Sequence, residues 1–365
     1  MKIGLLIYGD LETVTGGFLY DRLLVEYLQS QGEQVEVISL PWPSYRRGLW
    51  ENYSRAFRRR LERLECDMLL QDELIHPSFF RLNRKLRRRL ECPIVSLVYH
   101  LRANEVHPPC RRRIYRWVER QYLQSVDGYV CISRAIQRDV EKMAGNGRPL
   151  LVAQAGGDRL PGSISQEQIA ARTLAPGPLE IVFIANLIPR KELHTLLAAL
   201  ATLPRAGWRL TAAGSLTMDV PYVEAIRRRL EQLGLTGKVD LVGTLDRKEL
   251  ASLLARSHVL AVPSSYEAFG IVYLEGMSFG LPAIASTAGG ANEIINHGVD
   301  GFLVTPGDSP ALAGHLERLM LDRGLLLQMG LAAQGNFLRH PTWEESLETI
   351  HRFLHDFKAQ SDAEA

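Results

Sequence analysis

Two glutamates stand eight positions apart in the segment PSSYEAFGIVYLEGMSFGLPAIAS, residues 263–286. The apolar run before them, HVLAVP, predicts a short buried strand, and FGIVYLEGMSFG predicts a helix that begins near Phe269. Glu267 would then lie just before the helix N-terminus, and Glu275 about a turn and a half inside the helix. Because helix N-termini attract anions, two carboxylates here indicate a ligand with an anionic part and a second part that carboxylates bind.

Other segments whose residue types could bind a ligand follow apolar runs in the same half of the chain. ANLIPRKEL carries the cations Arg190 and Lys191, AAGS carries Gly214, and TAGGANEII places two glycines before a helical stretch. A lysine with amide-rich turns and helix N-termini makes a phosphate site. Carboxylates repel phosphate, but they accept hydrogen bonds from vicinal hydroxyls. The segments together predict a nucleotide sugar, with Glu275 on the ribose, Glu267 on the transferable sugar and helix amides on the diphosphate.

Strands must position these residues, and short apolar runs alternate with helical stretches along the whole chain. Most runs are continuous, as expected of strands buried on both faces of a parallel sheet. We therefore predict an α/β fold of two Rossmann-like doubly wound domains that face each other across a cleft. The runs are KIGLLIYG, QVEVISL, DMLLQ, PIVSLVYH, GYVCIS and LLVAQAG in the first half, and LEIVFIANL, WRLTAAG, KVDLVGT, HVLAVPS, LPAIAST and GFLVTP in the second.

The domain boundaries follow from composition. We expect an N-terminal, acceptor-binding domain at 1–165 and a nucleotide-sugar-binding domain at 175–340, with a Pro/Gly-rich joint at 160–180. Residues 341–365 predict a C-terminal amphipathic helix, for which a return to the first domain is one option. Its apolar face would consist of Trp343, Leu347, Ile350, Leu354 and Phe357.

Composition excludes several classes of protein. The 365 residues are 46% apolar and 23% charged, as in ordinary globular proteins. No apolar run reaches the roughly 18 residues of a membrane span. The first apolar run ends at Gly9 and Asp10 after about six residues, so a buried strand is expected rather than a signal peptide. The four cysteines lack metal-type spacing, and we expect free thiols in a reducing cytoplasm.

The net charge of +2 is unevenly distributed: residues 1–175 carry +7 and the rest −5. Two interpretations of the arginine-rich segments stay open, namely solvated helix faces or a surface for an anionic partner. In LPWPSYRRGLWENYSRAFRRRLERL, aromatic residues accompany the arginines, which suits a lipid headgroup region. A helix packed within the first domain would look similar. The aromatic residues are Trp42, Tyr45, Trp50, Tyr53 and Phe57.

The motif EAFGIVYLE, with PSSY before it and GLPAIAS, GGANEII and GVDGFLV after it, resembles the donor-site signature of retaining GT-B glycosyltransferases of family 4. The resemblance covers residues 181–306 well and continues more weakly through the N-terminal half. It implies transfer of a hexose-type sugar from a nucleotide-diphosphate sugar to an acceptor hydroxyl with retention at the anomeric carbon. It implies no cofactor beyond the donor substrate.

The resemblance also implies roles for individual residues. Glu267, Lys191 and His100 match catalytic positions: Glu267 contacts donor-sugar hydroxyls, Lys191 neutralises the leaving diphosphate, and His100 lies near donor sugar and acceptor. Glu275 matches the ribose ligand. The remaining donor-binding positions are Gly16 and Gly17 in TGG, Asn186, Arg190, Gly214, Leu245, Ala268, Phe269, Gly270 and Ile271.

Three positions depart from the family pattern. Asn186 stands where an arginine often precedes the lysine by five positions, Leu101 replaces an aspartate after His100, and Ala155 occupies an asparagine position. Arg190 is the candidate to replace the missing cation. The sequence contains no Asp-x-Asp motif and no evident cluster for Mg²⁺, so a metal-independent reaction is expected, with cations and amides stabilising the leaving group.

Two other functions stay open: a nucleotide-sugar-binding protein of the same fold without transferase activity, and a GT-B phosphorylase or epimerase. A dinucleotide oxidoreductase is not favoured, because no Gly-x-Gly-x-x-Gly follows the first strand. The acceptor is expected to be a sugar, a lipid-linked or a small molecule, and an anionic membrane on its cytoplasmic face is a candidate partner. Nucleic acid is not expected, and the sequence gives no indication of oligomeric state, donor base or donor sugar.

Overall fold

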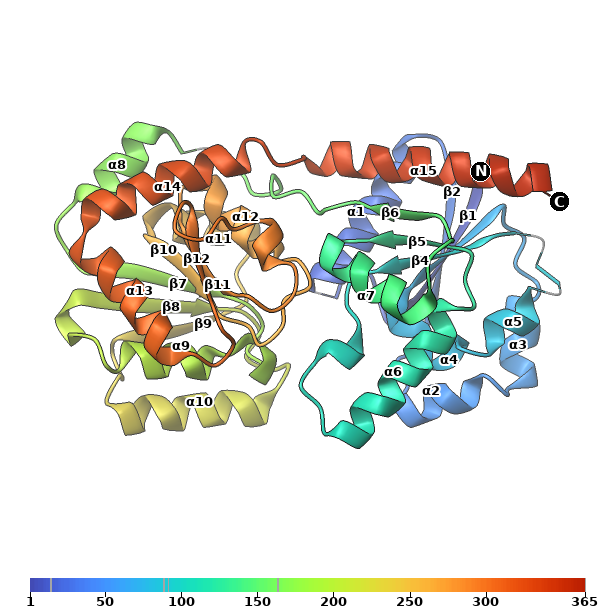
Figure 1. Cartoon of the computed structure of the whole chain (residues 1–365), viewed down its shortest axis with the longest axis horizontal. Coiled ribbons are helices and arrows are strands. Elements are labelled where there is room, and N and C mark those ends of the chain that lie inside the picture. The colour runs from blue at the N-terminus through green and yellow to red at the C-terminus, as the bar shows by residue number, and fades with distance from the viewer. Residues whose placement is uncertain (14, 88, 91, 163, 365) are drawn as a thin grey trace. The chain divides into compact units, whose positions relative to one another are not determined.

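The computed structural model describes residues 1–13, 15–87, 89–90, 92–162 and 164–364. The chain forms two compact units, in which Met1–Ala155 and Trp343–Ala365 make up the first and Gly156–Thr342 the second (Figure 1). Each unit is built on one six-stranded sheet whose paired strands are all parallel, with helices packed against it. The predicted α/β class with two Rossmann-like domains is confirmed.

The sheet of the first unit has the strand order β2-β1-β3-β4-β5-β6. Strands β3, β4 and β5 are fully buried, which explains why their sequences are continuous apolar runs rather than alternating ones. The order changes direction between β1 and β3, and such a switch point is where open α/β sheets bind ligands. The strands are β1 Lys2–Tyr8, β2 Gln34–Leu40, β3 Met68–Asp72, β4 Ile94–Val98, β5 Gly128–Cys131 and β6 Leu150–Val152.

The helices of the first unit connect these strands. Several begin at a serine or threonine whose hydroxyl accepts a backbone N–H of the first turn, as Thr15 does for α1 and Ser133 for α7. They are α1 Gly16–Ser30, α2 Tyr45–Glu51, α3 Arg55–Leu61, α4 His76–Phe79, α5 Leu82–Leu86, α6 Pro109–Leu123 and α7 Arg134–Ala144, with short 3₁₀ turns η1 Glu73–Ile75 and η2 Arg102–Asn104.

The sheet of the second unit has the order β12-β11-β10-β7-β8-β9. Counted within the unit, this is the 3-2-1-4-5-6 order of dinucleotide-binding folds, with its switch point between β7 and β10. The strands are β7 Leu179–Ile184, β8 Trp208–Ala213, β9 Val239–Gly243, β10 Val259–Val262, β11 Ala283–Ser286 and β12 Gly301–Val304.

The helices of the second unit include α8, which lies inside the segment expected to be the joint. α8 begins with a capping box at Ser165 and packs on α14 within the second unit, while the division between units falls at Ala155–Gly156. The helices are α8 Gln166–Leu174, α9 Leu193–Leu200, α10 Val220–Leu233, α11 Arg247–Arg256, α12 Ile271–Ser278, α13 Ser309–Leu321 and α14 Arg323–Phe337, with 3₁₀ turns η3 Pro189–Lys191, η4 Arg205–Gly207 and η5 Ala291–Glu293.

The C-terminal helix α15, Trp343–Glu364, belongs to the first unit and runs beside α1 (Figure 1). All five residues of its predicted apolar face are buried, which confirms the amphipathic helix. Phe357 packs closely over Gly128 at the start of β5, where an added Cβ would lie 2.8 Å from the Phe357 ring. The helix therefore completes the hydrophobic core of the first unit.

All twelve predicted strands are present, each within a residue or a few of its apolar run. The predicted helix near Phe269 begins two residues later, at Ile271, because Gly270 adopts a left-handed conformation. Within the described part of the chain, no helix has the length and apolar character needed to cross a membrane.

Candidate functional site

The loops after β7 and β10 meet at the switch point of the second unit. β7 and β10 pair side by side, so the segments that leave their carboxyl ends come together although they are more than 70 residues apart in sequence. The first loop carries Lys191 at the end of η3, and the second carries Glu267. Lys191 Nζ donates to Glu267 Oε2 at 2.5 Å. Two residues that the sequence assigned separately therefore form one ion pair.

Burial and mutual attraction set the charge states of this pair. Burial by itself would raise the pKa of Glu267, but the charges of Lys191 and Arg190 and a hydrogen bond from Ser264 hold it below its ordinary value. Burial lowers the pKa of Lys191, opposed by the charge of Glu267 and reinforced by Arg190. The site thus keeps a carboxylate ionised in a setting that excludes most water.

Arg190 takes part in the same arrangement. Its Nη1 donates to the carbonyl of Tyr266 at 3.0 Å, and its own carbonyl accepts the N–H of Ser265 at 2.8 Å. The cation therefore joins the loop after β7 to the loop that carries Glu267. The positive charge of Arg190 also helps to lower the pKa of Glu267.

Glu192, directly after Lys191, is the one described residue other than glycine with a positive φ, at 53°. Its carboxylate accepts the hydroxyl of Thr195 at 2.9 Å and the N–H of Gly307 at 3.0 Å, and it is the residue that caps α9. Strained backbone of this kind persists when the surroundings over-determine it and clusters at functional sites. Here the strained residue lies directly between Lys191 and the start of α9.

The glycines of TAGGANEII hold the backbone of Glu267 in place. A Cβ at Gly289 (φ 100°) would lie 1.9 Å from the Glu267 carbonyl oxygen, and Gly290 N–H donates to that oxygen at 2.7 Å. The N–H of Glu267 donates to Ala288. These glycines were expected at the head of a helix as part of a phosphate site, but only the 3₁₀ turn η5 follows them. Their structural role is close packing against the loop of Glu267.

Gly270 has a different role. With φ at 105° it is the left-handed residue that begins α12, and a Cβ there would lie 2.3 Å from the Tyr273 ring. Only glycine fits this turn without strain. Ala268 and Phe269 before it are buried, and Ile271 opens the helix half-buried.

Glu275 lies in α12, 3% exposed, where its carboxylate pairs with the guanidinium of Arg159. Burial raises the pKa of Glu275, and the charge and hydrogen bond of Arg159 oppose that rise. The sequence indicated the carboxylate but not its partner, because Arg159 lies 116 positions away and in no motif.

The other donor-site candidates surround the same strand ends. Asn186 Oδ1 accepts the N–H of Ser215 at 3.1 Å, so the amide in the expected arginine position joins the loops after β7 and β8. Gly214 directly follows β8 and donates its N–H to the carbonyl of Gly243. Leu245 is half-buried between β9 and α11. The three residues follow β7, β8 and β9, which lie in that order in the sheet.

In the first unit, Gly16 and Gly17 form the first turn of α1 rather than a free loop. A Cβ at Gly17 would lie 3.3 Å from the Tyr99 ring, so the glycine lets α1 approach the residue before His100. His100 Nε2 lies 2.9 Å from Glu105 Oε1, and His107 Nε2 lies 3.3 Å from Glu105 Oε2. The predicted glycines and histidine are thus brought together at the carboxyl ends of β1 and β4.

Three buried carboxyl groups, those of Asp21, Asp72 and Glu73, lie near Tyr99 and His100, and no motif in the sequence indicated them. Glu73 accepts the N–H of Tyr99 at 3.1 Å and of His100 at 3.0 Å, and Asp21 accepts the Tyr99 hydroxyl at 2.6 Å. Burial and mutual repulsion raise the pKa of Asp21 and Glu73 well above ordinary values, and burial also raises that of Asp72. The cluster occupies the β1–β3 switch point.

Glu119 of α6 orders the segment after His100. It accepts the N–H groups of Arg102 at 2.5 Å and Ala103 at 3.1 Å. Burial raises its pKa to about 7, although these hydrogen bonds lower it. Charged residues at helical spacing are common, so the sequence alone carried no signal for this role.

The two units match two known domains. The profile described as Glycosyl transferases group 1 matches residues 165–336, and that of the Glycosyl transferase 4-like domain matches residues 20–156. The second unit thus matches the group 1 glycosyltransferases, and the first unit matches the Glycosyl transferase 4-like domain. Both profiles describe domains of glycosyltransferases, and each falls almost entirely within one of the compact units described above.

Individual relatives agree with this assignment. Glycogen synthase of Mycobacterium tuberculosis is 26% identical over 295 residues, which are 78% of this chain and 69% of that protein. A GDP-mannose-dependent phosphatidylinositol monomannoside mannosyltransferase of the same organism is 30% identical over 50% of this chain and 48% of its own. The chain thus spans about half the length of that mannosyltransferase.

Solved structures show the same fold. Sucrose-phosphate synthase of Thermosynechococcus elongatus superposes with a TM-score of 0.82, covering 99% of this chain and 100% of that one at 19% identity. HepE of Anabaena, solved in complex with UDP-glucose, has a TM-score of 0.76 over 98% of this chain and 100% of its own at 21% identity. These likenesses confirm the fold of two Rossmann-like domains.

Proposed function

We propose that the protein transfers a hexose-type sugar from a nucleoside diphosphate sugar to an acceptor hydroxyl, with retention at the anomeric carbon and without a metal ion in the reaction. The observation that carries the proposal is the Lys191–Glu267 ion pair at the β7–β10 switch point. A buried carboxylate held ionised beside two cations suits a ligand with both hydroxyls and phosphates. The UDP-glucose complex of HepE supports a donor of this class.

In the proposed reaction, the bond between the anomeric carbon and the diphosphate oxygen breaks while the acceptor oxygen bonds to the same face of that carbon. The acceptor proton passes to the departing phosphate oxygen. Lys191 and Arg190 stabilise the negative charge that develops there. Glu267 holds donor-sugar hydroxyls, Glu275 holds the ribose, and His100 lies near the acceptor. No carboxylate is assigned to the opposite sugar face, which favours front-side attack.

A panel of UDP-, GDP- and ADP-sugars tests this proposal, with mass detection of the released nucleoside diphosphate. Each donor is incubated with and without a library of sugar, lipid-linked and small-molecule acceptors, in EDTA. Acceptor-dependent release, with an α-configured product by NMR from an α-linked donor, is expected. Binding of a donor without release or transfer would instead favour a nucleotide-sugar-binding protein. Formation of a sugar 1-phosphate from a saccharide and inorganic phosphate, without nucleoside diphosphate release, would favour a phosphorylase.

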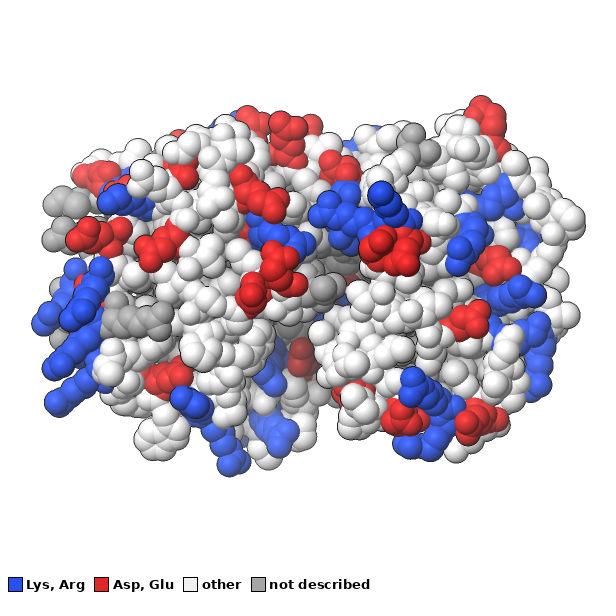
Figure 2. Space-filling model, turned by 180° about the vertical axis from the view of Figure 1, so that it is seen from behind, with Lys and Arg blue, Asp and Glu red and all other residues white. Residues whose placement is uncertain are grey.

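For the acceptor we propose access from a membrane surface on its cytoplasmic side, supported by the first unit. Trp42, Trp50 and Tyr53 are 58%, 75% and 52% exposed, whereas Tyr45 and Phe57 pack inward against Tyr115 and Phe79. Figure 2 shows basic side chains gathered at the end of this unit where α3 and α5 lie. Co-sedimentation at low salt should be stronger with anionic than with neutral vesicles; equal sedimentation would contradict this part of the proposal.

A further inference from the structure

A second group of side chains, which could act together as metal ligands, lies in the first unit, at the amino end of its sheet. Glu33 directly precedes β2, and His351 and His355 lie one turn apart on α15. The candidate donor and acceptor residues lie at carboxyl ends of strands, so this group belongs to neither. In the sequence the only signal is His-x-x-x-His in HRFLH, with the carboxylate more than 300 positions away.

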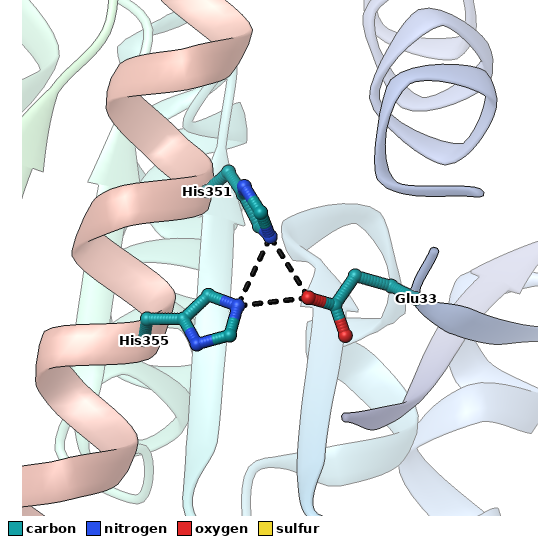
Figure 3. A group of neighbouring side chains, drawn as sticks. All are labelled: Glu33, His351 and His355. Atoms are coloured by element: carbon teal, nitrogen blue, oxygen red, sulfur yellow. Dashed lines mark hydrogen bonds and ion pairs between the residues drawn. The ribbon is translucent and has the colours of Figure 1, made fainter. Parts of the chain in front are cut away.

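The three side chains point toward one centre (Figure 3). His351 Nε2 and His355 Nε2 each lie 2.8 Å from Glu33 Oε1, and the two nitrogens are 3.0 Å apart. Each atom is a strong ligand for a metal ion. The other oxygen of Glu33 accepts from the terminal ammonium of Met1, so Oε1 is the one directed at the imidazoles.

Two imidazole nitrogens and one carboxylate oxygen are a ligand set suited to divalent transition ions, above all Zn²⁺. Tetrahedral Zn²⁺ with bonds of about 2.0–2.1 Å separates its ligand atoms by roughly 3.3 Å. Widening the observed triangle by a few tenths of an ångström therefore suffices. Two imidazole nitrogens at 3.0 Å satisfy each other poorly, since at most one N–H can lie between them. A cation at the centre satisfies all three atoms.

The surroundings allow entry and hold the ligands. The exposed fractions of the Glu33, His351 and His355 side chains are 6%, 19% and 48%, so the group opens to solvent on the side of His355. Glu33 also lines a cavity of about 600 Å³, together with Lys2, Gln29 and Arg63. The ring of Tyr27 on α1 packs edge-on against His351 at 6.3 Å between centroids. A fourth ligand from solvent has room at the exposed side.

We propose that Glu33, His351 and His355 bind one divalent transition metal ion, with Zn²⁺ as the expected occupant. The ion would join the last helix of the chain to the turn between α1 and β2. Its position at the amino end of the sheet gives it a structural role rather than one in sugar transfer. The proposal is independent of the proposed function and is compatible with a metal-free reaction.

The test uses the full-length protein after treatment with EDTA and a thiol reductant. Calorimetric titration with Zn²⁺ is expected to show one equivalent bound with a Kd of about 10 µM or tighter. Zn²⁺ should raise the Tm by several degrees, because a ligand of the folded state stabilises it. Co²⁺ should give visible absorption bands of tetrahedral intensity. H351Q, H355Q and E33Q should each weaken binding at least about a hundredfold, beyond the loss that outer-shell changes cause.

Two matched controls address other ligands. E348Q removes an exposed carboxylate of the same helix, and C66S removes the thiol that lies 3.3 Å from Cys92 and could itself bind Zn²⁺. Both should bind like the wild type. Because His355 is half-exposed, H355Q is expected to fold, and its circular dichroism checks this. Absence of saturable one-to-one binding in the wild type overturns the proposal. Binding that persists in H351Q and H355Q, or disappears in C66S, overturns it as well.

Discussion

Buried carboxyl groups at the two sheet switch points of this molecule have opposite kinds of partner. In the second unit, Glu267 and Glu275 each meet a cation, Lys191 and Arg159 respectively. In the first unit, Asp21 has only other carboxyl groups and the Tyr99 hydroxyl around it, among the contacts described for it. The sheet of the second unit thus has ion pairs at its switch point, whereas that of the first unit has carboxyl groups whose pKa is raised.

The difference follows from what each group does. An ion pair in a partly buried site can exchange its partner for ligand atoms, so it suits a place where hydroxyls and phosphates bind. The buried carboxyl groups of the first unit instead fix the backbone, as Glu73 does for Tyr99 and His100. We therefore expect charge-removing substitutions to be costly in the second unit and mild in the first.

The largest effect should come from breaking the Lys191–Glu267 pair. Lys191→Met or Glu267→Gln alone leaves a buried charge without its partner, and each should lower the free energy of unfolding by about 3–5 kcal/mol. The double variant should recover much of that loss, since no unpaired charge remains. Urea denaturation of the four proteins measures this cycle. Additive losses in the double variant would show that the two charges do not interact.

The two cations of the second unit, Lys191 and Arg190, should also differ in their contribution to kcat. Lys191→Ala is expected to lower kcat at least about a hundredfold, because a lost charge-assisted contact to the leaving group costs about 2.7–4 kcal/mol. Arg190→Ala should cost about tenfold, and Asn186→Arg in that background should restore part of the activity if one charge is needed near the diphosphate. Steady-state kinetics with a saturating donor decides this. An unchanged kcat in Arg190→Ala would assign Arg190 only to the loop contact with Tyr266.

The two glutamates of the second unit should separate kinetically. Glu275→Ala should mainly raise the donor KM, by about tenfold, because ribose contacts are similar in the ground and transition states. Glu267→Ala should lower kcat more, since in the proposed reaction it holds the sugar that develops charge. Arg159→Met is the matched control, as it leaves Glu275 unpaired without removing the hydroxyl ligand. Equal changes in KM alone for both glutamate variants would contradict these roles.

The smallest effect is expected at Asp21. Its raised pKa means that the folded state keeps a proton that the unfolded state has lost, so its contribution to stability decreases as pH rises above the ordinary aspartate pKa. Asp21→Asn keeps the shape and removes this dependence. At pH 5 the variant should be within about 1 kcal/mol of the wild type, and its relative stability should increase toward pH 8. A variant that loses stability relative to the wild type as pH rises would show that Asp21 is ionised in the folded protein.

Much of the fold was predictable from sequence, because parallel strands buried on both faces must be continuous apolar runs. All twelve runs are strands, and the helix of Glu275 lies where the apolar spacing indicated. Lys191 and Glu267 were also recognisable, since residues that follow strands of a parallel sheet collect at one edge. The sequence could not show that they pair, because that depends on β7 lying beside β10 rather than beside β9.

Tertiary structure decided the partners of the charged groups. Arg159 reaches Glu275, Glu119 orders the chain after His100, and Asp21, Asp72 and Glu73 meet at one point, all from positions without a shared motif. Glu33 and His351 are 318 positions apart. Apolar periodicity is a local property that can be recognised from neighbouring residues in the sequence. Electrostatic partnership depends on distances of a few ångströms between segments, and only the packed sheet and the return of α15 to the first unit determine those distances.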